Sequence, residues 1–107
     1  MVAARFEIFL VDLEPARGGE IKKTRPCVVI SPDEANRQLA TVIIAPMTTG
    51  SHPYPTRIAV TFKRKRGYVV LDQIRTVDRT RLVKKLGTID AEAARSVLSS
   101  LQSLFAP

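Results

Sequence analysis

The chain has 107 residues, of which 45% are hydrophobic and 25% are charged, and its formal net charge is +7. This length supports one small core, the composition excludes a disordered chain, and no apolar run approaches the roughly 20 residues that span a bilayer. We expect a single domain over residues 1–107 that is cytoplasmic and does not bind membranes, because the N-terminus also lacks the apolar segment of a secretory signal. The lone Cys27 is consistent with a reducing compartment.

The N-terminal half combines strand-like runs with one short helix. In chain order it predicts a strand at residues 5–13, a loop at 16–23, a strand at 26–30, a helix ending at residue 37 and a strand at 40–47. Ser31 is the expected N-cap of the helix, with Pro32 at its first position. The run 26–30 is too apolar for a half-exposed strand and should be central in its sheet. Pro26 is expected to open this strand, because proline cannot sit in the middle of one.

The C-terminal half continues the strand pattern and ends in a helix. It predicts a loop at residues 49–55, a strand at 57–62, a tight basic connection at 63–67, one or two strands at 68–77 and a short edge strand at 82–86. Asp90 is a natural N-cap for a terminal helix, whose apolar face comprises Ala94, Val97, Leu98, Leu101, Leu104 and Phe105. Five or more short strands and a terminal helix indicate a mainly β fold, a small and strongly bent antiparallel barrel.

Positive charge is concentrated in this second half. Between Arg57 and Lys85, ten basic residues stand against two acidic ones. Nucleic acid is the favoured partner, because each phosphate that a basic side chain neutralises releases counterions and the gain accumulates over several contacts. A merely solubilising surface and an anionic membrane are the alternatives, the second disfavoured because no basic amphipathic helix is present.

Several common catalytic sites are excluded by residue type. One Cys and one His cannot form a zinc set of the usual kind, and Gly18-Gly19 is not followed by the Lys-Ser/Thr of a Walker loop. His52 lies in a loop and Cys27 in an apolar run, so a solvated imidazole and a buried, inert thiol are favoured over catalytic groups. A two-metal centre would have to be assembled from Asp12, Glu20, Asp72 and Asp78 on distant strands and is disfavoured, so no metal or cofactor is expected.

Three polar clusters interrupt the apolar runs: Thr24-Arg25-Pro26, Thr48-Thr49-Gly50 and Asp72-Gln73. Together they supply a guanidinium, hydroxyls, a carboxylate and an amide, which are groups that bind phosphate. RNA is a substrate that such a site can cleave without an activated side-chain nucleophile, because the 2′-hydroxyl of RNA can itself attack the adjacent phosphate. The protein then has to hold the phosphate in line, stabilise charge on its oxygens and assist two proton transfers.

Each of these polar residues has a candidate role and an ordinary structural alternative. Arg25 offers a planar fork that matches phosphate and Thr48 can donate to a phosphate oxygen, although both also suit strand ends. Glu20 is the nearest loop carboxylate able to act as a base, or it is simply solvated. Asp72 orients Arg25, shares the proton transfer or forms an ordinary ion pair, and Gln73 reads an RNA base edge or closes a turn. Further predicted substrate-binding residues are Thr49, Lys22, Lys23 and Arg75.

The order and spacing of these blocks form a recognisable pattern. It comprises Val11-Asp12-Leu13-Glu14-Pro15, Arg17-Gly18-Gly19-Glu20, the run from Thr24 to Pro32, Ala45-Pro46-Met47-Thr48-Thr49 and the run from Leu71 to Asp78. In these blocks the chain resembles the MazF/PemK family of toxin endoribonucleases, and the resemblance covers essentially the whole sequence. No single block is decisive, but the blocks together are specific.

The resemblance implies an SH3-like barrel of five to seven short, mostly antiparallel strands, with a short helix after the second strand and a C-terminal helix. It implies a homodimer that is the toxin of a type II toxin–antitoxin system and inhibits translation and growth. Such a toxin cleaves single-stranded RNA, usually mRNA, at a short sequence without metal, leaving 2′,3′-cyclic phosphate and 5′-hydroxyl ends. A cognate acidic, MazE-like antitoxin is also implied, to which a +7 toxin is a fitting counterpart.

The resemblance also assigns residues and exposes departures. The family's catalytic arginine and threonine fall on Arg25 and Thr48, its loop glutamate on Glu20 and its strand glutamine on Gln73. A loop histidine and an arginine of some relatives are replaced by Gly19 and Val70, so a mechanism built on those two residues does not transfer.

Two other functions stay open on the sequence. A toxin of the same architecture that binds DNA gyrase relies on aromatic residues at the C-terminus, whereas this chain ends Leu104-Phe105-Ala106-Pro107. A passive RNA- or DNA-binding barrel needs several exposed aromatic side chains as a stacking platform, and most of the six aromatic residues here are expected in the core.

Overall fold

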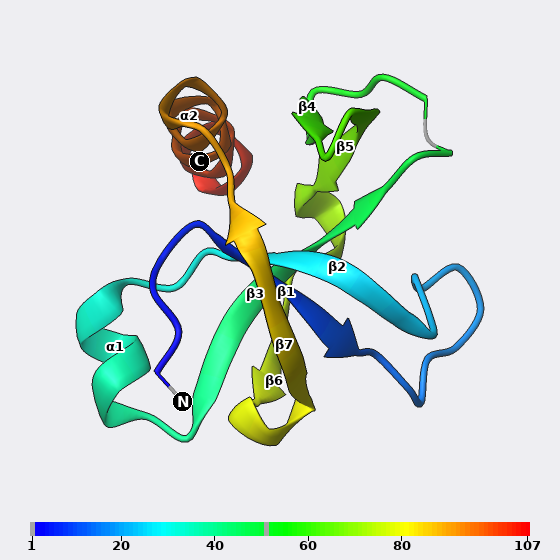
Figure 1. The fold of residues 1–107 in the computed structure, drawn as a ribbon. Coiled ribbons are helices and arrows are strands. Elements are labelled where there is room, and N and C mark those ends of the chain that lie inside the picture. Colours follow the sequence, from blue (N-terminus) through cyan, green and yellow to red (C-terminus); the bar gives the residue numbers. More distant parts are fainter. Residues whose placement is uncertain (1, 51) are drawn as a thin grey trace.

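The computed structural model describes residues 2–50 and 52–107 and shows a strongly curled sheet with helices at its margins (Figure 1). Within these residues there are seven strands: β1 (Glu7–Asp12), β2 (Thr24–Val29), β3 (Thr41–Thr48), β4 (Arg57–Phe62), β5 (Lys65–Val70), β6 (Arg75–Asp78) and β7 (Leu82–Thr88). The helices are α1 (Asp33–Gln38) and α2 (Ala91–Phe105), and the single turns of 3-10 helix are η1 (Leu71–Gln73) and η2 (Arg79–Arg81). The predicted mainly β, SH3-like barrel with a short helix and a C-terminal helix is confirmed.

All strand pairs are antiparallel, and the sheet is a half-barrel with two ends. Its order is β4-β5-β3-β2-β1-β7, with β6 paired to β3 beside this path. The two end strands differ in regularity. The pairing of β4 with β5 runs without interruption from Arg57 to Phe62, whereas the pairing of β7 with β1 contains two register shifts.

Strand β3 changes partner along its length, and this change creates the space for the site described below. It pairs with β6 from Thr41 to Ile44 and with β5 at Met47 and Thr48. Pro46 lies between these two ladders, where its missing N–H interrupts neither of them. The turn η1, which joins β5 to β6, passes this same point and brings Asp72 and Gln73 there.

Buried side chains form two clusters on the two faces of the curled sheet. The cluster covered by α2 includes Ile8, Val28, Ile30, Met47, Val69, Leu71, Ala93, Ala94 and Val97. The second cluster includes Phe9, Val11, Leu13, Cys27, Val29, Val42, Ile44, Val77 and Leu82. Successive β2 residues alternate between the clusters, so both faces of β2 are buried and its predicted central place is confirmed.

The terminal helix begins as predicted. The Asp90 carboxylate accepts a hydrogen bond from the Ala93 N–H at 2.8 Å and caps the helix. Leu104 and Phe105 lie beyond the covered cluster and are 39% and 70% exposed. Among the described residues, no helix is long and apolar enough to cross a membrane.

Three local expectations were wrong. Ser31 does not cap α1: Pro32 holds that position, and Ser31 is buried with its hydroxyl bonded to Asn36. Pro26 lies inside β2, where it is tolerated because β3 pairs with β2 only from Cys27 onward. The basic connection shrinks from residues 63–67 to Lys63 and Arg64, whose φ angles of 50° and 65° form a tight hairpin turn, so β5 begins at Lys65.

Candidate functional site

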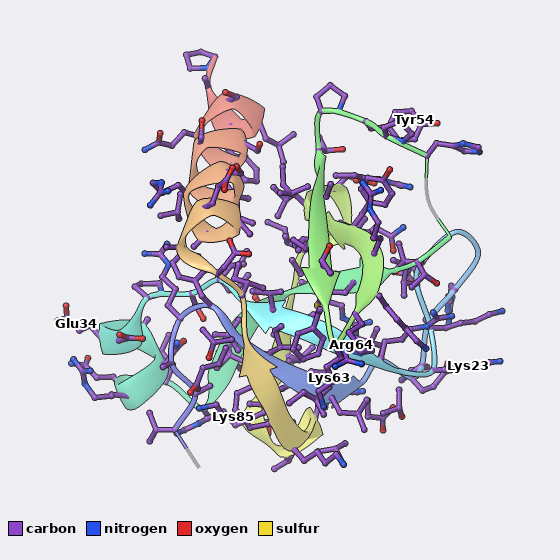
Figure 2. The ribbon with its side chains drawn as sticks, turned by 45° about the horizontal axis from the view of Figure 1, so that its top comes forward. Lys23, Glu34, Tyr54, Lys63, Arg64 and Lys85 are labelled. Atoms are coloured by element: carbon purple, nitrogen blue, oxygen red, sulfur yellow. The ribbon has the colours of Figure 1, made fainter. Side chains whose placement is uncertain are left out.

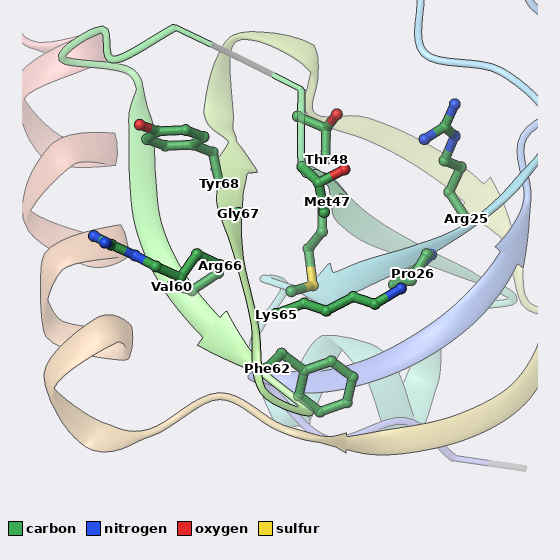
Figure 3. A pocket seen from close by; sticks show the side chains of 11 residues that line it. Arg25, Pro26, Met47, Thr48, Val60, Phe62, Lys65, Arg66, Gly67 and Tyr68 are labelled. Atoms are coloured by element: carbon green, nitrogen blue, oxygen red, sulfur yellow. The ribbon is translucent and has the colours of Figure 1, made fainter.

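A pocket of about 240 Å³ opens where the β4–β5 hairpin meets β2 and β3. Figure 3 shows Arg25 and Pro26 of β2 on one side of this pocket, Met47 and Thr48 of β3 in the middle, and the β4–β5 hairpin on the other side. Arg25, Thr48 and Thr49, from two of the three predicted polar clusters, all line it. The structure therefore brings these two clusters together.

Arg25 and Thr48, the two principal polar side chains of this pocket, each keep hydrogen-bond donors that are not used within the described residues. Arg25 is half-buried, and its Nε donates to the Lys22 carbonyl at 3.2 Å. That is the Arg25 side chain's only hydrogen bond within the described part of the chain, so its terminal nitrogens have no hydrogen-bond partner there. The Thr48 hydroxyl accepts from the Gly50 N–H at 3.3 Å, which leaves its own hydrogen available to donate.

A glycine on β5 sets how closely the hairpin approaches Thr48. A Cβ atom on Gly67 would lie 2.6 Å from the Thr48 carbonyl oxygen, closer than any side chain could be accommodated without movement. The glycine thus permits the contact that places Tyr68 opposite Thr48 in the register. The pocket depends on this approach, because both strands contribute to its wall.

The remaining walls of the pocket are apolar and basic. Met47, Val60, Phe62 and Tyr68 supply the apolar surface, and Lys65 and Arg66 add positive charge at the rim. Figure 2 shows Lys63 and Arg64 at the tip of the same hairpin and Lys23 at the end of the loop before β2. None of the hairpin residues was predicted for the site. The strand-like runs on either side of Lys63-Arg64 indicate a hairpin. That indication is weak, because the turn lacks the Asn-Gly pair typical of tight hairpins.

A second pocket, of about 380 Å³, collects other predicted residues at the point where β3 changes partner. It is lined by Glu20, Ile21, Pro46, Asp72, Gln73, Ile74 and Arg75. Glu20, Asp72, Gln73 and Arg75 are thus grouped together, but they do not line the Arg25 pocket.

Asp72 forms an ion pair with Arg57 and not with Arg25. Arg57 binds both carboxylate oxygens, with Nε–Oδ1 and Nη2–Oδ2 distances of 3.2 and 3.1 Å, and the Thr56 hydroxyl donates to Oδ1 at 2.9 Å. The Arg57 hydrogen bond is the main reason why the pKa of Asp72 is lowered and that of Arg57 raised. Of the alternatives for Asp72, the structure shows the ordinary ion pair, and the orientation of Arg25 by Asp72 is not seen.

The other residues of the second pocket bind backbone groups. Gln73 accepts from the Ile21 N–H at 2.7 Å and donates to the Gly19 carbonyl at 3.1 Å. The Glu20 carboxylate accepts from the Arg17 N–H, and Arg75 donates to the Leu13 carbonyl at 3.1 Å. Loop 16–23 is therefore tied to η1 through Gln73.

The lysines and the cysteine complete the predicted set. Lys22 and Lys23 are exposed at the end of loop 16–23, and Lys23 has a φ of 71°.

Cys27 is fully buried, and burial raises its pKa to about 12 despite the opposing charges of Arg75 and Arg25. Its predicted buried state is confirmed. In the part of the chain that the structure describes, no three His, Cys, Asp or Glu side chains are grouped so as to hold a metal ion.

Comparisons with known proteins give a consistent assignment. Residues 4–105 match the family model described as "PemK-like, MazF-like toxin of type II toxin-antitoxin system". The Endoribonuclease MazF of Staphylococcus epidermidis is 38% identical over 88 residues, covering 77% of this chain and 73% of that protein. The Endoribonuclease EndoA of Bacillus subtilis is 33% identical over 108 residues, covering 95% and 93%. A crystal structure of MazF from Deinococcus radiodurans has a TM-score of 0.85 at 25% identity, covering 97% of this chain and 96% of that one.

Proposed function

Because the chain belongs to the PemK-like, MazF-like family of type II toxin–antitoxin toxins, we propose that it is an endoribonuclease that cleaves single-stranded RNA. Its cellular substrate is mRNA, cut at a short sequence in the cytoplasm, with inhibition of translation and growth as the result. The chemistry takes place at the Arg25 pocket.

The observation that carries this proposal is the composition of that pocket. Within the described residues, the terminal nitrogens of Arg25 and the hydroxyl hydrogen of Thr48 are available to donate, while Met47 and Phe62 provide apolar surface. A phosphate with an adjacent base presents the matching surfaces, since the phosphate accepts charged hydrogen bonds and the base is flat and apolar on its faces.

The proposed reaction uses the RNA's own nucleophile. The 2′-oxygen attacks the adjacent phosphorus, the bond from phosphorus to the 5′-oxygen breaks, and the products carry a 2′,3′-cyclic phosphate and a 5′-hydroxyl. One proton leaves the 2′-hydroxyl and one is delivered to the departing 5′-oxygen. Arg25 and Thr48 stabilise the charge that develops on the phosphate oxygens. Glu20, which lines the second pocket, is the proposed base. The residues proposed to contact the RNA are Gln73, Asp72, Thr49, Lys22, Lys23 and Arg75.

Two partners are part of the proposal. The family description names a toxin–antitoxin system, so a cognate antitoxin is expected, and its acidic character would complement a net charge of +7. A homodimer is proposed on the family resemblance. Light scattering of the toxin alone tests the homodimer, and the mass measured after adding a candidate acidic antitoxin tests the complex.

Digestion of a long unstructured RNA in the presence of excess chelator tests the activity and its independence from metal. We expect discrete fragments whose 5′ ends carry a hydroxyl, so that they are labelled by polynucleotide kinase without prior phosphatase treatment. Intact RNA, cleavage only with added Mg²⁺, or 5′-phosphate ends would contradict the proposal. Salt-dependent binding without any product would instead support the passive RNA-binding alternative.

A further inference from the structure

The Gln73 side chain holds the loop before β2 at two points, one on each side of Glu20. Its Oε1 accepts from the Ile21 N–H at 2.7 Å, and its Nε2 donates to the Gly19 carbonyl at 3.1 Å. Gln73 is itself fixed, because η1 begins at the fully buried Leu71 and is followed by Ile74, which packs against the cluster under α2. The side-chain amide of Gln73 thus binds the backbone of residues 19 and 21, which lie more than 50 residues away in the sequence.

Gln73 ties the middle of this loop to a distant element. Gly18 has a φ of 56°, and a Cβ atom at Gly18 or Gly19 would have no neighbour within 4 Å, so packing does not hold these residues. Glycines lose the most backbone freedom on ordering. The hydrogen bonds between Arg17 and Glu20 are local to the loop. At its far end, Lys23 bonds Glu14 and Leu13, and Ile21 packs against the second cluster.

The same loop holds Arg25. Lys22 directly follows Ile21, and its carbonyl accepts the hydrogen bond from the Arg25 Nε at 3.2 Å. Because that is the only hydrogen bond of the Arg25 side chain within residues 2–50 and 52–107, the position of the Lys22 carbonyl decides where the guanidinium points. A continuous path therefore leads from Gln73 through the Ile21 and Lys22 peptide groups to Arg25.

We propose that Gln73 is a positioning residue, which orients Arg25 toward the phosphate by fixing the backbone of residues 19–22. This inference rests on the proposed ribonuclease function for its catalytic consequence, but the contact itself belongs to the free protein. For Gln73 this role replaces the direct RNA contact proposed above, because its amide already uses one acceptor site and one donor on the loop. It also joins the two pockets, one of which holds Gln73 and the other Arg25.

The decisive variant is Gln73→Met, which keeps the length of the side chain and removes both hydrogen bonds. Gln102→Met, at an exposed glutamine of α2, is the matched control. In the free protein, we expect NMR to show roughly 5- to 10-fold faster hydrogen exchange at the Ile21 amide and at the Arg25 Nε in Gln73→Met. Gln73→Glu keeps the acceptor for Ile21 and should retain most of the protection at that amide.

Cleavage kinetics give the second readout. We expect kcat of Gln73→Met to fall roughly 10-fold with KM nearly unchanged and with the same cleavage sequences as wild type, because a misplaced catalytic group slows the chemical step. Gln73→Glu should recover part of the loss. Altered cleavage sequences with normal exchange at Ile21 and Arg25 would overturn the proposal in favour of base reading.

The two proposals fail in different ways. Exchange at wild-type rates in Gln73→Met overturns the positioning role whatever the activity. If wild type cleaves no RNA but exchange increases as expected, the ribonuclease function fails while the loop contact stands. If Gln73→Met does not fold, Gln73→Glu decides: faster Arg25 Nε exchange supports the role, and exchange at the wild-type rate overturns it.

Discussion

Arg25 is the side chain on which the proposed chemistry depends most. Replacing it with Ala should lower the cleavage rate by roughly 10²-fold or more, because the phosphate oxygens lose their charged donor. Lys should restore little of this, since an ammonium group has no planar fork. Initial rates on a defined RNA, with circular dichroism to verify the fold, measure both effects.

Arg95 provides the control for that experiment. It is exposed on α2 and does not line the Arg25 pocket, so Arg95→Ala removes the same charge elsewhere and should cleave at nearly the wild-type rate. Equal losses in the two variants would mean that net charge, and not the position of Arg25, supports cleavage.

Cys27 should be unreactive in the folded protein. Burial raises the pKa of this thiol to about 12, so almost no thiolate is present near neutral pH, and the sulfur is also shielded from solvent. Iodoacetamide at about pH 8 should leave the native protein unmodified for hours and label it quickly in concentrated guanidinium chloride, as read by mass spectrometry. Rapid labelling of the native protein would show that β2 opens readily.

The Asp72–Arg57 pair should contribute to stability in a pH-dependent way. Because the folded pKa of Asp72 is lowered, the contribution is fully present above the unfolded pKa of roughly 3.9 and is lost as pH falls through the folded value. The Asp72 side chain is 36% exposed, so the pair is screened, and Asp72→Asn should cost only about 0.5 kcal/mol at neutral pH. Urea unfolding measures this difference, which should vanish once Asp72 is protonated; a difference that persists in acid would point to another cause.

Among the elements, the β4–β5 hairpin depends on one close approach. Gly67→Ala should destabilise the fold by about 1–3 kcal/mol, because the new Cβ would lie against the Thr48 carbonyl oxygen and the strands must separate. Cleavage should fall as well, since Thr48 moves. A Cβ atom at Gly50 would have no neighbour within 4 Å. The free energy of unfolding of Gly50→Ala, measured in urea, should therefore stay within about 0.5 kcal/mol of wild type. Equal stabilities of the two variants would refute this account of Gly67.

Elements that depend on local signals were predictable from the sequence. The range of β4 agrees at both ends, and α2 begins after its predicted cap, because strand alternation and a capping carboxylate are encoded within a few residues. The start of β5 was missed because Lys63 and Arg64 form a turn that usually carries Asn-Gly.

Contacts between distant segments were the part that sequence could not supply. Nothing local to Asp72 indicates that its partner is Arg57, and nothing in Gln73 indicates that its amide binds residues 19 and 21. The first contact follows from the pairing of β4 with β5, which places Arg57 opposite Val70. The second follows from the path of η1 past the point where β3 changes partner. The sequence correctly indicated that the clusters with Arg25 and Thr48 belong to one site. It did not indicate that Glu20, Asp72 and Gln73 line a different pocket.

Over the whole molecule, charge should govern how tightly RNA is held. With about four phosphate contacts, affinity for a single strand should fall roughly 10- to 100-fold between about 50 and 200 mM salt. Fluorescence anisotropy with the Arg25→Ala variant measures binding without cleavage. An affinity that does not change with salt would mean that the basic residues between Arg57 and Lys85 do not contact the RNA backbone.

Within the described residues, β4, β6 and β7 each pair on one side only, and the end strands β4 and β7 differ as templates for self-association. At one edge, β7 has register shifts and the exposed Lys84 and Lys85, which discourage another strand from pairing. At the other, β4 is regular and carries no charge from Ile58 to Phe62. Mutual repulsion between +7 molecules opposes aggregation through β4, and salt screens that repulsion. Low ionic strength is therefore the better storage condition, and Thr61→Lys would protect this edge outside the Arg25 pocket.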